Sequence, residues 1–173
     1  AWVDKSLLNV NDFILREKGW LPSAESTSSP KLHWVREGQG LVVMLCHALG
    51  CDLSMWDAVA ERLSQRFTVI RYDARGHGQS TAPAGPYSME MLADDAAAFI
   101  TAQASGPVHF VGLSMGGMTA QALAARHPQL VKSITIANAA LVYGEPAAAV
   151  WQARMDTVRK QGVAAVAESA IQR

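Results

Sequence analysis

Residues 108–118 of the chain read VHFVGLSMGGM, and this stretch decides the fold class. The opening VHFV has the length and apolar character of a buried strand. It leads into Gly112-Leu113-Ser114-Met115-Gly116, which fits the pattern G-x-S-x-G, and residues 115–126 then predict a helix that stops before Pro128. Strand, G-x-S-x-G and helix in that order are the setting of a nucleophile elbow, a turn that strains the serine and exposes its hydroxyl above the sheet. Glycines flank the serine because a Cβ there would strike the neighbouring strand and helix.

Two interpretations of Ser114 follow from this context. In the first, the serine only caps the helix after a glycine turn. In the second, which the strand–turn–helix setting favours, Ser114 is a nucleophile that attacks a carbonyl carbon. The backbone N–H of Met115, aimed by the start of the helix, then helps to hold the negative charge on the carbonyl oxygen.

The pattern around this motif alternates short apolar runs with helical spacing. Because parallel strands need crossover connections, the alternation predicts an α/β fold, a parallel sheet flanked by helices on both faces. The strands are expected at residues 32–36, 41–46, 67–72, 108–112 and 131–137, and the helices at 55–65, 88–103 and 115–126. After Gly144 no strand returns, and residues 147–173 are expected to be helical with Trp151, Met155 and Val158 on one face.

Composition shifts divide the chain into four parts. We expect an N-terminal helical segment at residues 1–20 and a linker rich in serine and proline at 21–30. Residues 31–143 form the sheet and its helices, and residues 144–173 are the helical region that follows.

The bulk properties exclude several classes of protein. The 173 residues carry 15 basic and 15 acidic side chains, so the basic excess of a nucleic-acid or anionic-membrane binder is missing. No apolar run approaches the roughly 20 residues of a membrane-spanning helix, and residues 1–13 do not resemble a signal peptide. With only two cysteines and no disulfide framework, a cytoplasmic location is expected. The chain begins at Ala1 instead of Met, so we expect a processed, trimmed or partial chain.

A second donor for the carbonyl oxygen is expected in the loop after the first buried strand. That loop begins His47-Ala48-Leu49-Gly50, and the backbone N–H of Leu49 is the candidate. His47 precedes the serine, whereas this kind of site orders nucleophile, acid and histidine along the chain, so we expect it to orient the loop. A metal site of Cys46, His47 and Cys51 lacks a fourth ligand and the usual spacing, so we expect neither a metal nor a cofactor.

Four charged residues surround a glycine turn after the strand at 67–72: Arg71, Asp73, Arg75 and His77. The cluster has two interpretations, a phosphate cradle or a set of ion pairs and turn hydrogen bonds that lock the loop. The second is favoured, because a phosphate site needs its glycine loop to open a helix, and here prolines follow.

Six stretches together resemble the α/β-hydrolase family, and within it the 3-oxoadipate enol-lactonases. The resemblance runs from Leu32 to Arg173, about four fifths of the chain, and is carried by HALGCDLSMWD at 47–57, RYDARGHGQS at 71–80, GPYSMEMLADD at 85–95, HFVGLSMGGM at 109–118, ITIANAA at 134–140 and VWQARMDTVRKQG at 150–162. A shorter stretch, AWVDKSLLNVNDF at residues 1–13, resembles a helix of 4-carboxymuconolactone decarboxylases.

The resemblance implies a serine hydrolase that opens an enol-lactone through an acyl-enzyme in the breakdown of aromatic compounds. Ser114 would be the nucleophile, with Leu49 and Met115 as oxyanion donors, and residues 144–173 would begin a helical cap. Leu141 stands where such lactonases commonly carry Lys or Arg, so a cation of the cap, Arg154 before Arg159, is expected to bind the substrate carboxylate, with Trp151 as a second substrate-binding residue. The alternative is that both arginines are solvated on the helix surface. The alternatives are a carboxylesterase or cofactor-free perhydrolase of the same fold, or a non-catalytic interaction protein.

The catalytic set is expected to be incomplete within these residues. The only histidine after Ser114 is His127, roughly 18 Å away at the far end of the helix that the elbow opens. Asp156, the only later aspartate, lies inside the cap-like helix. A second polypeptide or a downstream segment is therefore expected to supply one Asp and one His, the acid and the base that a serine nucleophile needs.

Overall fold

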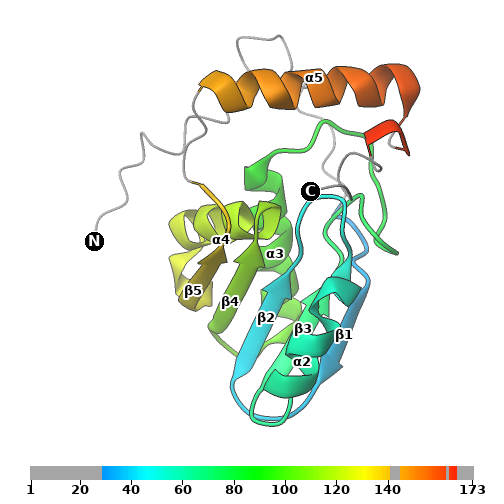
Figure 1. The fold of residues 1–173 in the computed structure, drawn as a ribbon. Coiled ribbons are helices and arrows are strands. Elements are labelled where there is room, and N and C mark those ends of the chain that lie inside the picture. Colours follow the sequence, from blue (N-terminus) through cyan, green and yellow to red (C-terminus); the bar gives the residue numbers. More distant parts are fainter. Residues whose placement is uncertain (1–28, 141–144, 163, 167–173) are drawn as a thin grey trace. The chain divides into compact units, whose positions relative to one another are not determined.

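The computed structural model of the chain describes residues 29–140, 145–162 and 164–166 (Figure 1). The expected N-terminal helix, the decarboxylase-like stretch and nearly all of the expected linker lie outside these residues. The chain divides into two compact units, residues 1–141 and residues 142–173.

The first unit is built on a five-stranded sheet in the order β1-β3-β2-β4-β5. Its strands lie where the sequence predicts them, with ends that differ by at most two residues: β1 (Trp34–Glu37), β2 (Val42–Cys46), β3 (Thr68–Tyr72), β4 (Val108–Leu113) and β5 (Val131–Ala137). Strands β3, β2, β4 and β5 run parallel to one another. The α/β class is therefore confirmed.

One strand departs from the expectation of a parallel sheet. Strand β1 pairs with β3 in the antiparallel direction, with Trp34 opposite Tyr72. The reason lies in the connection from β1 to β2, which consists of residues 38–41 alone. A parallel arrangement would require a crossover of about a dozen residues or more, so the short connection forces the chain to reverse.

Helices cover both faces of the sheet, as expected. The described elements are η2 (Leu53–Trp56), α2 (Asp57–Leu63), α3 (Met89–Gln103), α4 (Met115–Arg126) and the short turn η3 (Pro128–Leu130). Helix α3 begins at its predicted cap, since the Ser88 hydroxyl accepts a hydrogen bond of 3.2 Å from the Met91 N–H. The helix expected at residues 55–65 is instead a 3₁₀ turn followed by the short helix α2.

The core follows the alternation of side chains along the strands. Met44, Ile70 and Phe110 pack with α3 and α4 on one face, whereas Leu45 and Val69 pack with Trp56 and Ala60 on the other. The positions of the helices on the two faces can be followed in Figure 1. All of these core side chains are buried, so strands β2, β3 and β4 are covered on both faces of the sheet.

The second unit contains helix α5 (Glu145–Gln161). The helix expected over residues 147–173 is interrupted after Gln161, because Gly162 adopts φ +82° and its N–H donates to the carbonyl of Val158 over 2.8 Å. Residues 164–166 are helical again, and residues 167–173 lie outside the described residues. A glycine in the left-handed region is a common helix end, and the sequence carried this signal. No helix among the described residues is long and apolar enough to cross a membrane.

Candidate active site

The expected elbow lies between β4 and α4. Ser114 adopts φ +51° and ψ −111°, a conformation that is costly for a residue with a side chain. Two backbone hydrogen bonds hold it there: the Ser114 N–H donates to the carbonyl of Ala137 over 2.9 Å, and the Ser114 carbonyl accepts from the Met118 N–H over 3.0 Å. The strained turn is therefore fixed by β5 on one side and by α4 on the other.

The glycines of the motif meet the steric demand inferred for them. A Cβ on Gly112 would lie 2.0 Å from the carbonyl oxygen of Gly116, and one on Gly116 would lie 2.2 Å from the carbonyl oxygen of Cys46. Since the obstructing atoms are backbone, no side chain can move aside to admit a methyl group. The close approach of β2, β4 and α4 at this point depends on both glycines.

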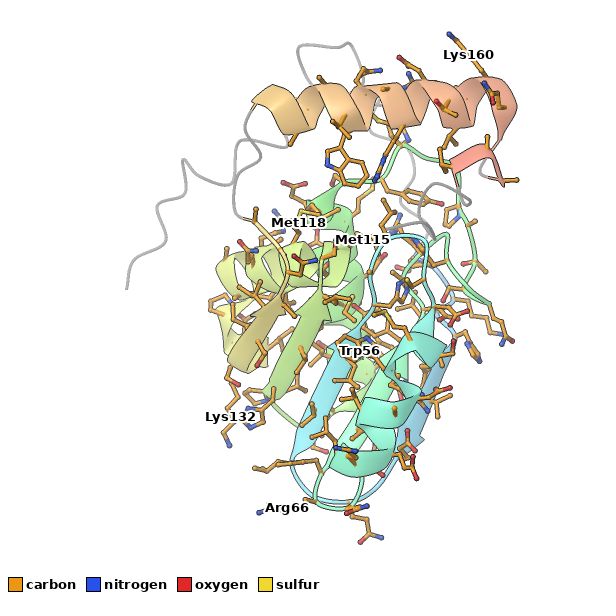
Figure 2. The ribbon with its side chains drawn as sticks, viewed as in Figure 1. Trp56, Arg66, Met115, Met118, Lys132 and Lys160 are labelled. Atoms are coloured by element: carbon orange, nitrogen blue, oxygen red, sulfur yellow. The ribbon has the colours of Figure 1, made fainter. Side chains whose placement is uncertain are left out.

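The expected oxyanion donors lie at the same edge of the sheet as Ser114. Met115 is the first residue of α4, where backbone N–H groups have no partner within the helix. Leu49 lies three residues beyond the end of β2, and β2 pairs with β4 so that Cys46 is opposite Gly112. Figure 2 shows Met115 at this edge, with Arg66 and Lys132 at the opposite one. Ligands of parallel sheets bind at this edge, outside the carboxyl ends of the strands.

A tight turn presents the Leu49 amide. The carbonyl of Ala48 accepts a hydrogen bond from the Cys51 N–H over 3.1 Å, and Gly50 adopts φ +76° within that turn. The side chain of Leu49 is 55% exposed. The conformation of this loop therefore depends on its backbone contacts and on the residues at its ends.

His47 has the geometry of a loop-orienting residue. Its ring is fully buried, Nε2 accepts a hydrogen bond of 2.9 Å from the Ala74 N–H, and Nδ1 donates to the carbonyl of Ala48 over 2.8 Å. Burial lowers the pKa of His47 below its ordinary value of 6.5, which favours the neutral ring that these bonds require. With both nitrogens engaged, His47 has no nitrogen available to act as a base.

The charged cluster after β3 forms ion pairs and turn hydrogen bonds, which confirms the favoured interpretation. Arg75 makes a bidentate pair with Asp95, over 2.5 and 2.6 Å, and Arg71 pairs with Glu37 over 2.9 Å and with Asp57. These arginines are largely buried. Their charges are satisfied by carboxylates of the same chain, which leaves them unsuited to a phosphate.

Asp73 forms the loop hydrogen bonds that were expected of this cluster, but its individual partners could not be predicted from the sequence. The Asp73 carboxylate is buried and accepts hydrogen bonds from the N–H groups of Leu53 (2.7 Å) and Gln79 (2.9 Å) and from His33 Nδ1 (2.9 Å). A carboxylate directly after a buried strand and before a glycine turn is a signal for such loop bonding. Its partners are mostly backbone amides, which leave no residue-type signature in the sequence.

The two cysteines occupy different environments. The Cys46 thiol is buried and accepts a hydrogen bond of 3.2 Å from the Tyr72 hydroxyl, and burial raises the pKa of the thiol to about 11. Cys51 is exposed. Within the described part of the chain, no three or more His, Cys, Asp or Glu side chains gather as metal ligands would.

All five histidines of the chain lie among the described residues, and none of them bonds to Ser114. His127 caps the far end of the 12-residue helix α4, and its Nε2 lies 2.7 Å from Asp94. His33 and His47 are engaged as described, and His77 and His109 bond to the Arg75 carbonyl and the Ser133 hydroxyl. The structure therefore does not join a histidine base to the serine.

The substrate-binding candidates on α5 contact each other. The guanidinium carbon of Arg154 lies 5.1 Å from the centre of the Trp151 ring, which is cation–π geometry. Arg159, one turn further on, pairs with Asp156 over 3.1 Å. Leu141 lies outside the described residues.

Three comparisons with known proteins agree with this geometry. A family model described as the alpha/beta hydrolase fold matches residues 42–168. The chain is 38% identical over 131 residues to 3-oxoadipate enol-lactonase 2 of Acinetobacter baylyi, covering 76% of this chain and 48% of that protein. The chain thus spans about half the length of the curated relatives it matches.

Solved structures show the same likeness. The crystal structure of the enol-lactonase from Burkholderia xenovorans LB400 superimposes with a TM-score of 0.77 at 38% identity, over 83% of this chain and 56% of that one. A thermophilic esterase from Thermogutta terrifontis gives 0.78 at 31% identity, over 87% and 56%.

Proposed function

This chain belongs to the α/β-hydrolase fold family, and from that membership and the elbow we propose that it carries the nucleophile of a serine hydrolase acting on an enol-lactone. The observation that carries the proposal is the conformation of Ser114, held at φ +51° between β4 and α4 beside the Leu49 loop. The likeness to 3-oxoadipate enol-lactonase 2 supports a lactone as the substrate.

In the proposed reaction, the Ser114 hydroxyl attacks the ring carbonyl carbon and gives its proton to a base. The N–H groups of Leu49 and Met115 stabilise the negative charge that forms on the carbonyl oxygen. When the tetrahedral intermediate collapses, the C–O bond of the ring breaks and the leaving oxygen departs as an enolate, which is protonated and becomes a ketone. Water then adds to the acyl-enzyme with the help of the same base, which releases a carboxylate and restores Ser114.

The base and its orienting acid are proposed to come from a downstream segment or a second polypeptide. Every histidine of the chain is engaged elsewhere, and His127 is separated from Ser114 by the full length of α4. Strand β5 supports this proposal, because among the described strands only β4 pairs with it and Ile136 is 41% exposed. Parallel strands are ordinarily buried on both faces, so further strands and helices are expected against β5.

Arg154 is proposed to bind the carboxylate of the substrate. Its contact with Trp151 places a cation beside an aromatic ring on α5, an arrangement suited to a small anionic molecule with an apolar ring. Arg159 serves as the matched control, since it lies on the same helix but is paired with Asp156. Arg154→Gln should raise KM for an anionic lactone more than for a neutral ester, and Arg159→Gln should change neither. An equal effect of Arg154→Gln on both substrates would contradict the assignment.

A substrate panel tests the proposed activity. The longer protein that contains this chain is assayed with the enol-lactone, with p-nitrophenyl acetate and for peracid formation, and Ser114→Ala is the control. We expect the highest kcat/KM for the enol-lactone and no turnover in the variant. Preference for the simple ester would instead indicate a carboxylesterase, and preference for peracid formation a perhydrolase.

The incomplete catalytic set has its own test. Residues 1–173 purified alone should not hydrolyse any of these substrates and should aggregate, because Ile136 of β5 is exposed and, among the described strands, only β4 pairs with β5. Ser114-dependent turnover by these residues alone would contradict the proposal. Failure of an organophosphonate probe to label Ser114 in the active longer protein would refute the role of the serine itself.

A further inference from the structure

The segment between β2 and η2 carries the Leu49 amide, and it is held at its two ends, since the Asp52 carboxylate accepts from the Ser54 N–H of η2 over 2.8 Å and His47 lies at the start. Leu49 is 55% exposed, and both Asp52 and Cys51 are exposed as well. Inside the segment, the Cys51 N–H bonds to the Ala48 carbonyl, and the Ala48 N–H contacts Met55 Sδ at 3.3 Å. The direction in which the Leu49 N–H points must therefore be set largely where the segment is anchored.

One anchor is the ring of His47. The Ala74 group is a backbone N–H and can only donate, so Nε2 of His47 must be the acceptor and the ring proton must lie on Nδ1. Nδ1 then donates to the carbonyl of Ala48, the residue before Leu49. The ring thereby connects the end of β3 to the peptide group that carries the Leu49 N–H, because the Ala48 carbonyl and the Leu49 N–H belong to the same peptide group.

The second anchor comes from the residue beside Ala74. Asp73 Oδ1 accepts a hydrogen bond of 2.7 Å from the Leu53 N–H, at the other end of the segment. Asp73 is itself held by His33 and by the Gln79 N–H, both at 2.9 Å. Asp73 and Ala74, which directly follow β3, therefore form hydrogen bonds to both ends of the segment that carries Leu49.

The ring of His47 is also confined from the side. The ring of His77 lies 5.0 Å away, centre to centre, at an angle of 55°. His77 is in turn fixed by a hydrogen bond of 3.0 Å between its Nδ1 and the carbonyl of Arg75. The buried His47 ring is thus packed against His77, and its two hydrogen bonds require a single tautomer.

We infer that His47 is a positioning residue for the oxyanion donor Leu49, acting through the hydrogen bond from Ala74 and the hydrogen bond to Ala48. The inference rests on the proposed function, since it assigns a role in the chemistry at Ser114. It differs from a role in general stability because it predicts a loss in the chemical step with substrate binding unchanged.

Two variants separate the hydrogen bonds. His47→Gln places a side-chain oxygen where Nε2 lies and keeps an acceptor for the Ala74 N–H. His47→Asn places an N–H donor where Nδ1 lies but cannot reach Ala74. In the longer protein that contains this chain, His47→Asn should lower kcat by about 10- to 100-fold with KM unchanged within about twofold, because a misplaced oxyanion donor loses much of its effect. His47→Gln has no donor for the Ala48 carbonyl, so it should lower kcat to a similar extent.

Ser88→Ala is the control for a loss of stability alone, because it removes the cap of α3 without contacting the segment, and it should leave kcat unchanged. An unchanged kcat in either His47 variant, or a rise in KM in place of the loss in kcat, would overturn the inference. Nuclear magnetic resonance decides it independently of turnover: the His47 ring should carry its proton on Nδ1, and the Leu49 amide resonance should move in both His47 variants and stay in place in Ser88→Ala. An Nε2–H tautomer or an unmoved Leu49 resonance would refute the positioning role even if Ser114 proves to be the nucleophile. Activity retained in Ser114→Ala would refute the proposed function and leave the tautomer test standing.

Discussion

Replacing Ser114 by glycine should stabilise the protein while it abolishes catalysis. The serine holds φ +51° and ψ −111°, and such a conformation costs a residue with a Cβ about 1–3 kcal/mol. Glycine adopts it without that cost but loses about 0.4–1 kcal/mol through the greater freedom of the unfolded chain. Taking the midpoints, the net gain in the free energy of unfolding is about 1.3 kcal/mol.

Ser114→Ala is the matched control, because it removes the same hydroxyl but keeps the Cβ and therefore the strain. Urea unfolding of the two variants isolates the cost of the Cβ. With a slope of about 2–3 kcal/mol/M, the midpoint for Ser114→Gly should lie about 0.4–0.7 M above that for Ser114→Ala. Both variants should be inactive towards the enol-lactone. A glycine variant no more stable than the alanine variant would show that Ser114 stores no strain, and the elbow argument would fail.

Three further predictions concern other parts of the first unit. Ser88→Ala should lower the free energy of unfolding by about 1 kcal/mol in denaturant titration, because the Met91 N–H loses its acceptor. Titration of the native protein with a thiol reagent at pH 8 should label Cys51 quickly and Cys46 only on unfolding, because Cys46 is buried and its thiol pKa is raised to about 11; rapid labelling of both would contradict this. The pKa of His47 is lowered in the folded state, so the unfolded chain binds the proton more readily. The stability that the neutral His47 ring contributes is therefore complete above about pH 6.5 and is lost as the pH falls from there through the folded pKa. His47→Gln should lack this pH-dependent part of the unfolding free energy.

The elbow could be predicted from the sequence because its requirements are local. A strand, a serine between glycines and a helix start follow one another within residues 108–118, and each glycine is needed because a Cβ there would collide with nearby backbone atoms. The positions of the strands could be predicted equally well, because apolar runs bounded by turn residues define them. The ends of β5 and α4 agree with the prediction to the residue.

The direction of β1 and the end of α5 were predicted wrongly although the sequence held the relevant signals. Four residues between β1 and β2 exclude a crossover, and Gly162 offers a left-handed helix end. In both cases a general pattern, the βα rhythm or the helical spacing, was extended past a local feature that interrupts it.

The support of the Leu49 segment was hidden for a different reason. That His47 orients the loop was predicted, but its partners are the amide of Ala74 and the carbonyl of Ala48, and every residue except proline offers an amide. Residue type cannot single out one amide among many. Only the register of β2 beside β3, which sets Cys46 opposite Tyr72, brings residues 47 and 74 together.

The geometry of the nucleophile also depends on β5, which follows β4 in the strand order. Ser114 donates its N–H to the carbonyl of Ala137, the last residue of β5, and a Cβ on Gly117 would lie 2.7 Å from Ala139, just beyond that strand. Displacement of β5 would therefore release the strained turn at Ser114. Strand β5 is held by β4 and α4, while Ile136 and Thr135 are exposed. A segment that pairs with the outer edge of β5 would thus do more than bring an acid and a base: by fixing Ala137, it would hold Ser114 in the conformation from which it attacks.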